Sequence, residues 1–158
     1  MAGVRKIVPQ KLEIKYYKKK DGHSLFNGIP KNLPSLYRAY LLTERASRVG
    51  FDWPNIEGVL KKMDEEMKEL REALSLQNRK RIREEIGDLL FASVNLARFL
   101  RINPEEALRR TLEKFTLRFH YIETSLRKKG KTLSQSNLME MDDLWEEAKH
   151  QKMRLPKK

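Results

Sequence analysis

The 158-residue sequence has no cysteine, only three histidines and no long apolar run. The absence of cysteine excludes disulfides, thiolate metal ligands and cysteine nucleophiles. The histidines are widely spaced, which argues against a zinc site built on imidazole. No apolar stretch approaches the roughly 20 residues that span a bilayer, and the N-terminus lacks the apolar core of a signal peptide. We therefore expect a cytoplasmic protein that makes no contact with a membrane.

The net charge of +12 is concentrated at the two ends of the chain. Residues 1–32 contain eight Lys or Arg and two acidic residues, and residues 150–158 contain four Lys or Arg and no acidic residue. These segments carry +6 and +4, which leaves +2 for the residues between them. Basic tails hold nucleic acid by releasing counterions, without reading its sequence. We expect nucleic-acid binding to be weak and nonspecific, and to occur through the tails.

The composition divides the chain into three parts: a basic N-terminal arm or linker (1–32), a helical domain (33–152) and a basic C-terminal tail (153–158). Glycine and proline interrupt the arm, and its only strand-like alternation is Leu12, Ile14 and Tyr16. Two interpretations of the arm remain open. It is either a solvated extension, or it contains a short strand that packs on the domain or pairs across a dimer.

Hydrophobic periodicity predicts about five helices after the arm, joined by short connections. The first ends at Gly50, which is placed as a C-terminal cap, and Pro54 suits the first position of the second helix. Asn103 and Asn137 are expected to cap the fourth and fifth helices. Apolar residues at helical spacing form the predicted inward seam of the second helix: Ile56, Leu60, Met63, Met67, Leu70 and Leu74. Long amphipathic helices with short connections predict an all-α antiparallel bundle.

Two pairs of carboxylates lie on neighbouring helices of this bundle. Glu66 and Glu69 are three residues apart on the second helix, and Glu85 and Asp88 repeat that spacing on the third. A short break at residues 75–78 makes the two helices antiparallel neighbours, so the pairs can meet. Carboxylates brought together need cations between them, and oxygen ligands of this kind select Mg²⁺ or Mn²⁺. The alternative is that they are solvated surface residues, since Glu is common at this spacing.

Further residues support a polar site around the carboxylates. Gly87 lies inside a helix, where glycine costs about 1 kcal/mol relative to alanine, and it allows close approach of another helix or a ligand. Arg81 and Asn95 continue the stripe of Glu85 and Asp88. Complementary charge and an aromatic ring for a nucleotide could come from two later pairs four residues apart, Lys114 with Arg118 and Trp145 with Lys149. Surface charges and a core tryptophan are the alternative interpretation of these pairs.

Several of these segments together resemble the MazG family of nucleoside triphosphate pyrophosphohydrolases. The resemblance covers about residues 23 to 152, and is greatest to the C-terminal catalytic half of two-domain MazG proteins. The segments that carry it are Gly50–Phe51–Asp52–Trp53, Glu65–Glu66–x–x–Glu69, Glu84–Glu85–x–Gly87–Asp88, Asn95–Leu96–Ala97–Arg98, Lys114–Phe115–x–x–Arg118–Phe119 and Trp145–x–x–x–Lys149.

The resemblance implies a Mg²⁺-dependent enzyme that converts nucleoside triphosphates to monophosphate and pyrophosphate as nucleotide-pool housekeeping. It implies that Glu66, Glu69, Glu85 and Asp88 hold the metal, with Mn²⁺ as a possible substitute. Glu65 would be a further catalytic carboxylate that accepts a proton. The implied substrate-binding residues are Arg81, Lys114, Arg118, Trp145 and Lys149, and Asn95 joins them because it lies on the stripe of Glu85 and Asp88. The resemblance further implies a homodimer or higher homo-oligomer with sites near subunit contacts.

A second functional hypothesis is a helical nucleic-acid-binding protein with basic arms and no catalysis. The carboxylates argue against it, because without a metal they would repel phosphate. Salt-dependent RNA binding without magnesium-dependent release of pyrophosphate would favour it. The sequence leaves the base preference, the sugar preference and the attacked phosphorus undetermined.

Overall fold

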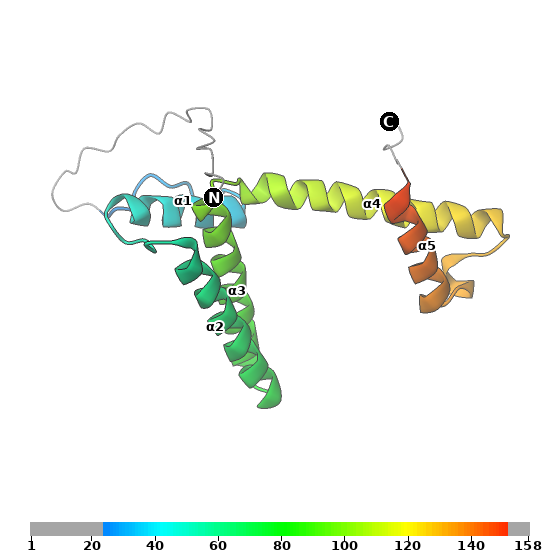
Figure 1. The fold of residues 1–158 in the computed structure, drawn as a ribbon, viewed down its shortest axis with the longest axis horizontal. Helices are drawn as coiled ribbons and strands as arrows, with labels where there is room; N and C mark the ends of the chain where they lie inside the picture. The colour runs from blue at the N-terminus through cyan, green and yellow to red at the C-terminus, as the bar shows by residue number, and fades with distance from the viewer. Residues whose placement is uncertain (1–23, 152–158) are drawn as a thin grey trace, which may run out of the picture. The chain divides into compact units, whose positions relative to one another are not determined.

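The structure, a computed structural model, describes residues 24–151 and is all-helical over that range (Figure 1). This confirms the predicted fold class. The strand-like pattern at Leu12–Tyr16, most of the basic arm and the basic tail lie outside the described residues. The elements are α1 (Ser35–Arg48), α2 (Ile56–Ser75), α3 (Arg79–Phe99), α4 (Pro104–Lys128), a short 3-10 helix (Leu133–Gln135) and α5 (Leu138–His150).

The chain forms two compact units that divide after Glu105. The first contains α1, α2 and α3, and the second contains most of α4 together with α5. Each unit has its own packing and is described by itself. The single catalytic domain expected over residues 33–152 remains a prediction. Among residues 24–151, no helix is both long and apolar enough to cross a membrane.

Four helices end in the same backbone arrangement, the fourth at Gly130 after α4, where φ is 69°. After α1, Gly50 has a φ of 90°, and the Phe51 N–H donates to the Ala46 carbonyl oxygen at 3.1 Å. This closes the helix as a Schellman motif, which confirms the predicted role of Gly50. Gln77 after α2 and Arg101 after α3 have φ values of 50° and 59°. Both residues lie in the left-handed region of φ and ψ, which residues other than glycine rarely occupy.

Asparagine side chains cap the N-termini of α2 and α3, the two helices that carry the candidate site. Asn55 accepts a hydrogen bond from the Gly58 N–H at 3.1 Å, and Asn78 accepts one from the Arg81 N–H at 3.1 Å. Because Asn55 caps the helix, α2 begins at Ile56, and the prediction that Pro54 is its first residue is wrong. The amide satisfies an N–H group that would otherwise lack a partner at the helix start, and this fixes the start after the proline.

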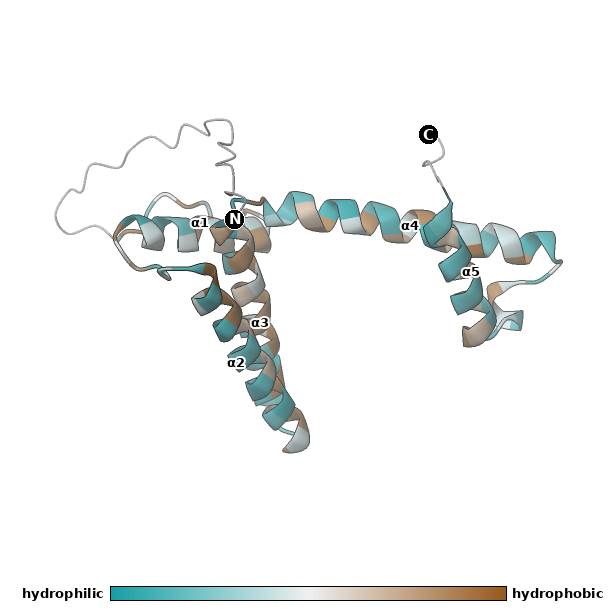
Figure 2. Cartoon of the chain, viewed as in Figure 1, coloured by the Kyte–Doolittle hydropathy of each residue, from teal (hydrophilic) through white to brown (hydrophobic). Residues whose placement is uncertain are grey.

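In the first unit, α2 and α3 pack side by side as a hairpin, and α1 packs on α3 (Figure 1). The buried residues of α2 are Val59, Glu66 and Ala73, each seven residues from the next. The predicted seam is therefore displaced by one position. Figure 2 shows hydrophobic and hydrophilic residues interspersed along both helices of the hairpin. Three seam residues are substantially exposed: Leu60 (46%), Met67 (37%) and Leu74 (53%).

The second unit has a conventional apolar core. Ile122 and Leu126 of α4 pack with Leu144 of α5, and all three are buried. Partly buried hydrophobic residues around them complete the core: Phe119, Tyr121, Met141 and Trp145. Asn137 caps α5 by accepting from the Glu140 N–H at 2.9 Å, as predicted. Leu138, the first residue of the helix, is 79% exposed.

Candidate functional site

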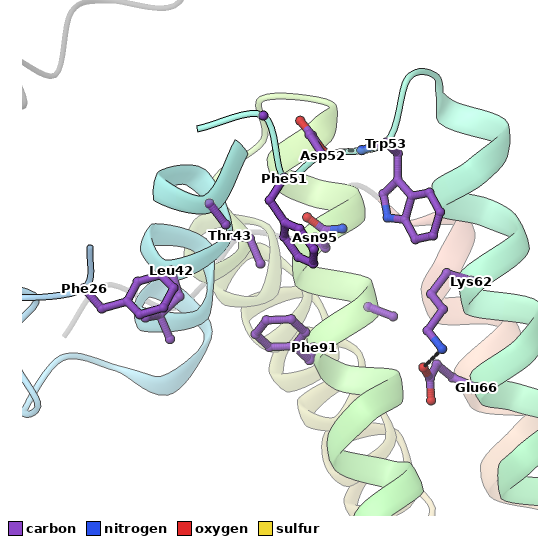
Figure 3. Close-up of a pocket in the computed structure, with 13 residues that line it drawn as sticks. Phe26, Leu42, Thr43, Phe51, Asp52, Trp53, Lys62, Glu66, Phe91 and Asn95 are labelled. Carbon is purple, nitrogen blue, oxygen red and sulfur yellow. Dashed lines mark hydrogen bonds and ion pairs between the residues drawn. The ribbon is translucent and has the colours of Figure 1, made fainter. Parts of the chain in front are cut away.

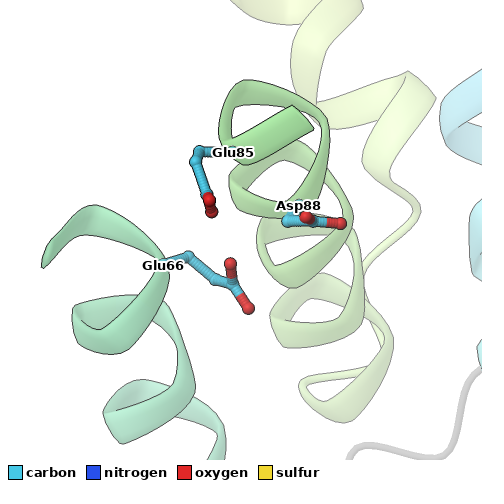
Figure 4. A group of neighbouring side chains, drawn as sticks. All are labelled: Glu66, Glu85 and Asp88. Atoms are coloured by element: carbon cyan, nitrogen blue, oxygen red, sulfur yellow. The ribbon is translucent and has the colours of Figure 1, made fainter. Parts of the chain in front are cut away.

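Three carboxylates from two helices meet inside the α2–α3 hairpin. One oxygen each of Glu66, Glu85 and Asp88 lies within 4.8 Å of the others. Figure 4 shows Glu66 reaching from α2 toward the two residues of α3. Glu66 is 6% exposed and Glu85 is 9% exposed, so these charges are withdrawn from water. Buried carboxylates held this close need positive charge among them, and three hard oxygen donors from two rigid helices fit a divalent cation such as Mg²⁺.

Two basic side chains contact the outer edges of this group. The Lys62 Nζ lies 2.8 Å from Glu66 Oε1 and 3.3 Å from Glu65 Oε1. Its hydrogen bond to Glu66 raises the pKa of the Lys62 ammonium. On the other helix, the Arg81 Nε donates to Glu85 Oε1 at 3.1 Å. The folded chain thus supplies part of the countercharge for its own buried acids.

Glu69 lies beside the three-carboxylate group without being one of its members. Partial burial and the neighbouring charges of Glu85 and Glu66 raise the pKa of Glu69 above its ordinary value. The electrostatic field of the group therefore reaches this fourth predicted ligand. Glu65 is more than half exposed and interacts with Lys62. The two carboxylates differ because Glu69 shares the helix face of Glu66, whereas Glu65 lies on the adjacent face.

An apolar pocket of about 660 Å³ adjoins the carboxylates (Figure 3). Aromatic rings dominate its wall, and Glu66 and Lys62 lie at one end of it. The lining residues come from the segment before α1, from α1, the 50–53 loop, α2 and α3. They are Phe26, Leu42, Thr43, Ala46, Gly50, Phe51, Asp52, Trp53, Lys62, Glu66, Phe91, Ala92 and Asn95.

The 50–53 loop is fixed to the helices by one ion pair and one close contact. Arg98, which is 7% exposed, donates through both terminal nitrogens to Asp52, at 2.8 and 2.5 Å. The hydrogen bond from Arg98 lowers the pKa of the Asp52 carboxyl. Trp53 lies against Gly58, where an added Cβ would come within 3.0 Å of the ring. These contacts hold two aromatic side chains of the loop in the pocket wall.

Sequence reasoning missed part of this site. Phe51 and Trp53 were recognised only as a motif, and Lys62 was not singled out. One signal was available, because Lys62 precedes Glu66 by four residues and so lies one turn away on the same face. The aromatic residues offered no comparable signal, since their common pocket arises from three separate segments.

The expected role of Gly87 is not supported within this chain. A Cβ built at Gly87 would meet no atom within 4 Å among the described residues, so no helix of the described chain approaches it. Close approach occurs instead at Gly58, where the absence of a side chain allows the Trp53 ring to pack against the backbone of α2. The sequence did not indicate this role. The open position of Gly87 leaves space for a ligand or for a second chain.

The remaining predicted residues belong to the second unit. Trp145 contacts the Phe115 ring at 5.3 Å between centroids, and the Arg118 guanidinium lies 5.4 Å from the Trp145 ring centroid. Lys149 forms an ion pair with Glu146, one turn earlier on α5. Lys114 is exposed. Arg118 and Trp145 are thus brought together, and Trp145 also packs on the apolar core.

Comparisons of the sequence with known proteins identify a family of nucleotide hydrolases over the segment that forms this site. Residues 55–122 match the MazG nucleotide pyrophosphohydrolase domain. The chain is 45% identical over 117 residues to the nucleoside triphosphate pyrophosphohydrolase/pyrophosphatase MazG of Thermotoga maritima. The aligned region covers 74% of this chain and 45% of that protein. It is 39% identical over 137 residues to the nucleoside triphosphate pyrophosphohydrolase of Escherichia coli K12, which covers 84% of this chain and 51% of that protein.

A third relative, protein YabN of Bacillus subtilis, described as uncharacterised, is 49% identical over 73 residues, covering 46% of this chain and 15% of that protein. The chain spans about half the length of the two pyrophosphohydrolases. The matched domain contains all four predicted metal-ligand carboxylates and both helices of the hairpin that brings three of them together. The family resemblance found in the sequence is confirmed, and the chain belongs to the MazG family.

Proposed function

We propose that this chain hydrolyses nucleoside triphosphates to nucleoside monophosphate and pyrophosphate in a magnesium-dependent reaction. The observation that carries the proposal is the position of Glu66, which belongs to the three-carboxylate group and also lines the aromatic pocket. One side chain thereby connects a place for a divalent cation with a place for a nucleobase. A nucleotide with its metal needs both, at adjacent positions.

Glu66, Glu69, Glu85 and Asp88 would hold Mg²⁺, with Mn²⁺ as a substitute. A bound ion would neutralise triphosphate charge and polarise a phosphoryl oxygen. Two of the four carboxylates are buried, and the pKa of a third, Glu69, is raised by partial burial and by the nearby charges of those two. This arrangement supports a shared cation, because four acids at separate solvated positions would show neither burial nor mutual repulsion.

The chain's own groups supply proton transfer and positive charge. Glu65 accepts the proton of the attacking water as the new phosphorus–oxygen bond forms and the bond to pyrophosphate breaks. Lys62 lines the pocket and contacts both Glu65 and Glu66, and its ammonium can bind a phosphate oxygen once it leaves Glu66. Arg81 keeps Glu85 oriented through their hydrogen bond.

Four residues of the second unit are also proposed to bind substrate. Lys114 and Arg118 lie four residues apart on one face of α4 and would share the charge of the leaving pyrophosphate. Trp145 and Lys149 have the same spacing on α5. The contact of Arg118 with the Trp145 ring supports a joint role for these two residues.

We further propose that the chain acts as a homodimer or higher homo-oligomer in the cytoplasm. Apolar residues point outward from both helices of the hairpin: Leu60, Met67, Leu74, Ile86 and Leu90 are each more than a third exposed. Contiguous exposed apolar surface on a soluble protein marks an interface, and a second copy of the hairpin would cover it.

The competing hypothesis of a non-catalytic nucleic-acid-binding protein has no specific observation in its favour. The basic segments on which it depends lie largely outside the described residues. The acidic group at the centre of the first unit would repel a nucleic-acid backbone. Weak, nonspecific binding through the tails remains a prediction.

The function is tested by incubating the full chain with Mg²⁺ and a panel of canonical and damaged nucleoside triphosphates, and measuring pyrophosphate. We expect release with the wild-type chain and a loss of at least about 100-fold in Asp88→Ala. Helicity by circular dichroism should be unchanged, because removing one acid also relieves repulsion. The control is Glu84→Ala, an exposed acid on the same helix. Near-normal release by Asp88→Ala would contradict the metal assignment.

A further inference from the structure

Arg98 is held in one orientation inside the first unit. Both of its terminal nitrogens donate to Asp52, and the side chain is almost fully buried. A guanidinium paired through two parallel hydrogen bonds cannot rotate without breaking both. Its remaining Nε–H donor therefore points in a fixed direction.

That donor fixes the orientation of the Asn95 amide. The Arg98 Nε donates to Asn95 Oδ1 at 3.0 Å. Arginine has no acceptor, so the amide oxygen of Asn95 must face Arg98 and the NH₂ group must face away from it. Figure 3 shows the amide nitrogen on the side of Trp53 and the oxygen on the opposite side. No group within residues 24–151 accepts a hydrogen bond from this NH₂.

The NH₂ group is thus a fixed hydrogen-bond donor in the wall of an aromatic pocket. Phe51, Trp53 and Phe91 supply the rings, and Trp53 is kept in place by its contact with Gly58. A volume of about 660 Å³ is within the range of small-molecule sites. Planar bases stack on aromatic side chains, and this orients their hydrogen-bonding edges toward polar groups in the wall.

We propose that Asn95 is a specificity residue that selects nucleobases with a carbonyl oxygen, the 6-oxopurines and 4-oxopyrimidines, over those with an amino group at the same position. This inference rests on the proposed function, because it takes the pocket to be the place of the base. A carbonyl oxygen accepts the Asn95 donor. An exocyclic amino group would place two donors face to face and leave both without a partner.

The test compares pairs of substrates that differ at this position: inosine with adenosine triphosphate, and deoxyuridine with deoxycytidine triphosphate. We expect the wild-type chain to show a higher kcat/KM for the oxo member by roughly fivefold to tenfold, the value of one hydrogen bond. Asn95→Asp keeps an acceptor for Arg98 and replaces the donor by a second acceptor. The oxo-to-amino ratio should fall about tenfold or more and invert in both pairs. Asn95→Ala should bring the ratio near one.

The comparison of ratios separates specificity from general damage. An added carboxylate repels every triphosphate equally, and this effect cancels between members of a pair. Asn78→Asp is the matched control, since it adds the same charge about 25 Å away along α3 and retains an acceptor for the cap. A melting curve shows whether Asn95→Asp folds, and Asn95→Ser replaces it if it does not.

Each outcome bears on the inference. A fall of the ratio in both pairs with the Asn95 variants, and none with Asn78→Asp, supports it. Turnover of all four nucleotides with ratios unchanged by Asn95→Asp and Asn95→Ala overturns this inference and leaves the proposed function intact. Failure to release pyrophosphate from any of the four overturns both.

Discussion

In the first unit, the inward face of α2 holds Glu66 between Val59 and Ala73, whereas the inward faces of α4 and α5 in the second unit hold Ile122, Leu126 and Leu144. The helices of both units are amphipathic. Among the described residues, only in the second unit do large apolar residues form a buried cluster, and there it takes in the C-terminal half of α4, since Leu108, Leu112 and Phe115 of the same helix are exposed. In the first, the interior holds acids and small residues, and larger apolar residues remain exposed. Thus one unit is built around its core, and the other around its candidate site.

The largest effect that tests this contrast is expected in the second unit. Leu126 is 1% exposed and lies at the centre of the apolar cluster. Leu126→Ala should lower the free energy of unfolding by about 3 kcal/mol, from lost burial and the cavity left behind. Leu60→Ala, at a 46% exposed position of the first unit, should cost less than about 1 kcal/mol in the monomer. Urea unfolding measures both.

Light scattering on the same two variants sharpens the comparison. Leu60→Ala should weaken self-association, because Leu60 belongs to the exposed face that we assign to an interface. If Leu60→Ala destabilises the monomer as much as Leu126→Ala does, the apolar stripe of α2 is part of a core and the contrast fails.

A smaller effect with a distinct pH dependence is expected at Glu69. Its pKa is raised in the folded chain, so ionisation of Glu69 opposes folding. Above its raised pKa the metal-free protein carries the full cost of partly burying this charge and of placing it beside Glu85 and Glu66. Below the ordinary value of 4.5 the group is protonated in both states and this cost is gone. Glu69→Gln should therefore melt at a higher temperature than the wild type at neutral pH. The difference should shrink as the pH falls toward 4.5.

Melting curves across this pH range, in the presence of a chelator, test the prediction. Glu84→Gln is the control, since Glu84 is exposed on the neighbouring helix. If the difference in melting temperature between Glu69→Gln and wild type is constant with pH, the folded chain does not raise the pKa of Glu69.

The smallest effect is expected at two helical glycines. Gly87→Ala should stabilise the chain by about 1 kcal/mol, because alanine favours the helix and the new methyl meets no described atom. Gly58→Ala gains the same propensity but brings its Cβ within 3.0 Å of Trp53, so the ring must shift. We expect the two variants to differ in sign by thermal denaturation, and in tryptophan fluorescence. Equal stabilisation would show that Trp53 does not depend on Gly58.

The sequence predicted the helices better than it predicted their buried faces. Gly50 and Asn137 were identifiable because caps depend on local chemistry alone. The inward face of α2 was misplaced because periodicity assigns the apolar stripe to the interior, and here Glu66 lies there instead. The carboxylates were found from spacing and from the family resemblance. The pocket was not, since its aromatic wall depends on the Asp52–Arg98 contact between residues distant in the sequence.

The ion pair between Lys62 and Glu66 has a thermodynamic consequence. Many small metalloproteins fold only when they bind their ion, because their ligands cannot otherwise be kept together. Here an ammonium from the preceding helical turn partly compensates the buried acid in the folded chain. We therefore predict that the chain reaches its native state in a metal-poor environment and binds an ion afterwards. Folding and metal-dependent activation would then be separate equilibria, so scarcity of the ion would abolish the proposed activity without unfolding the chain.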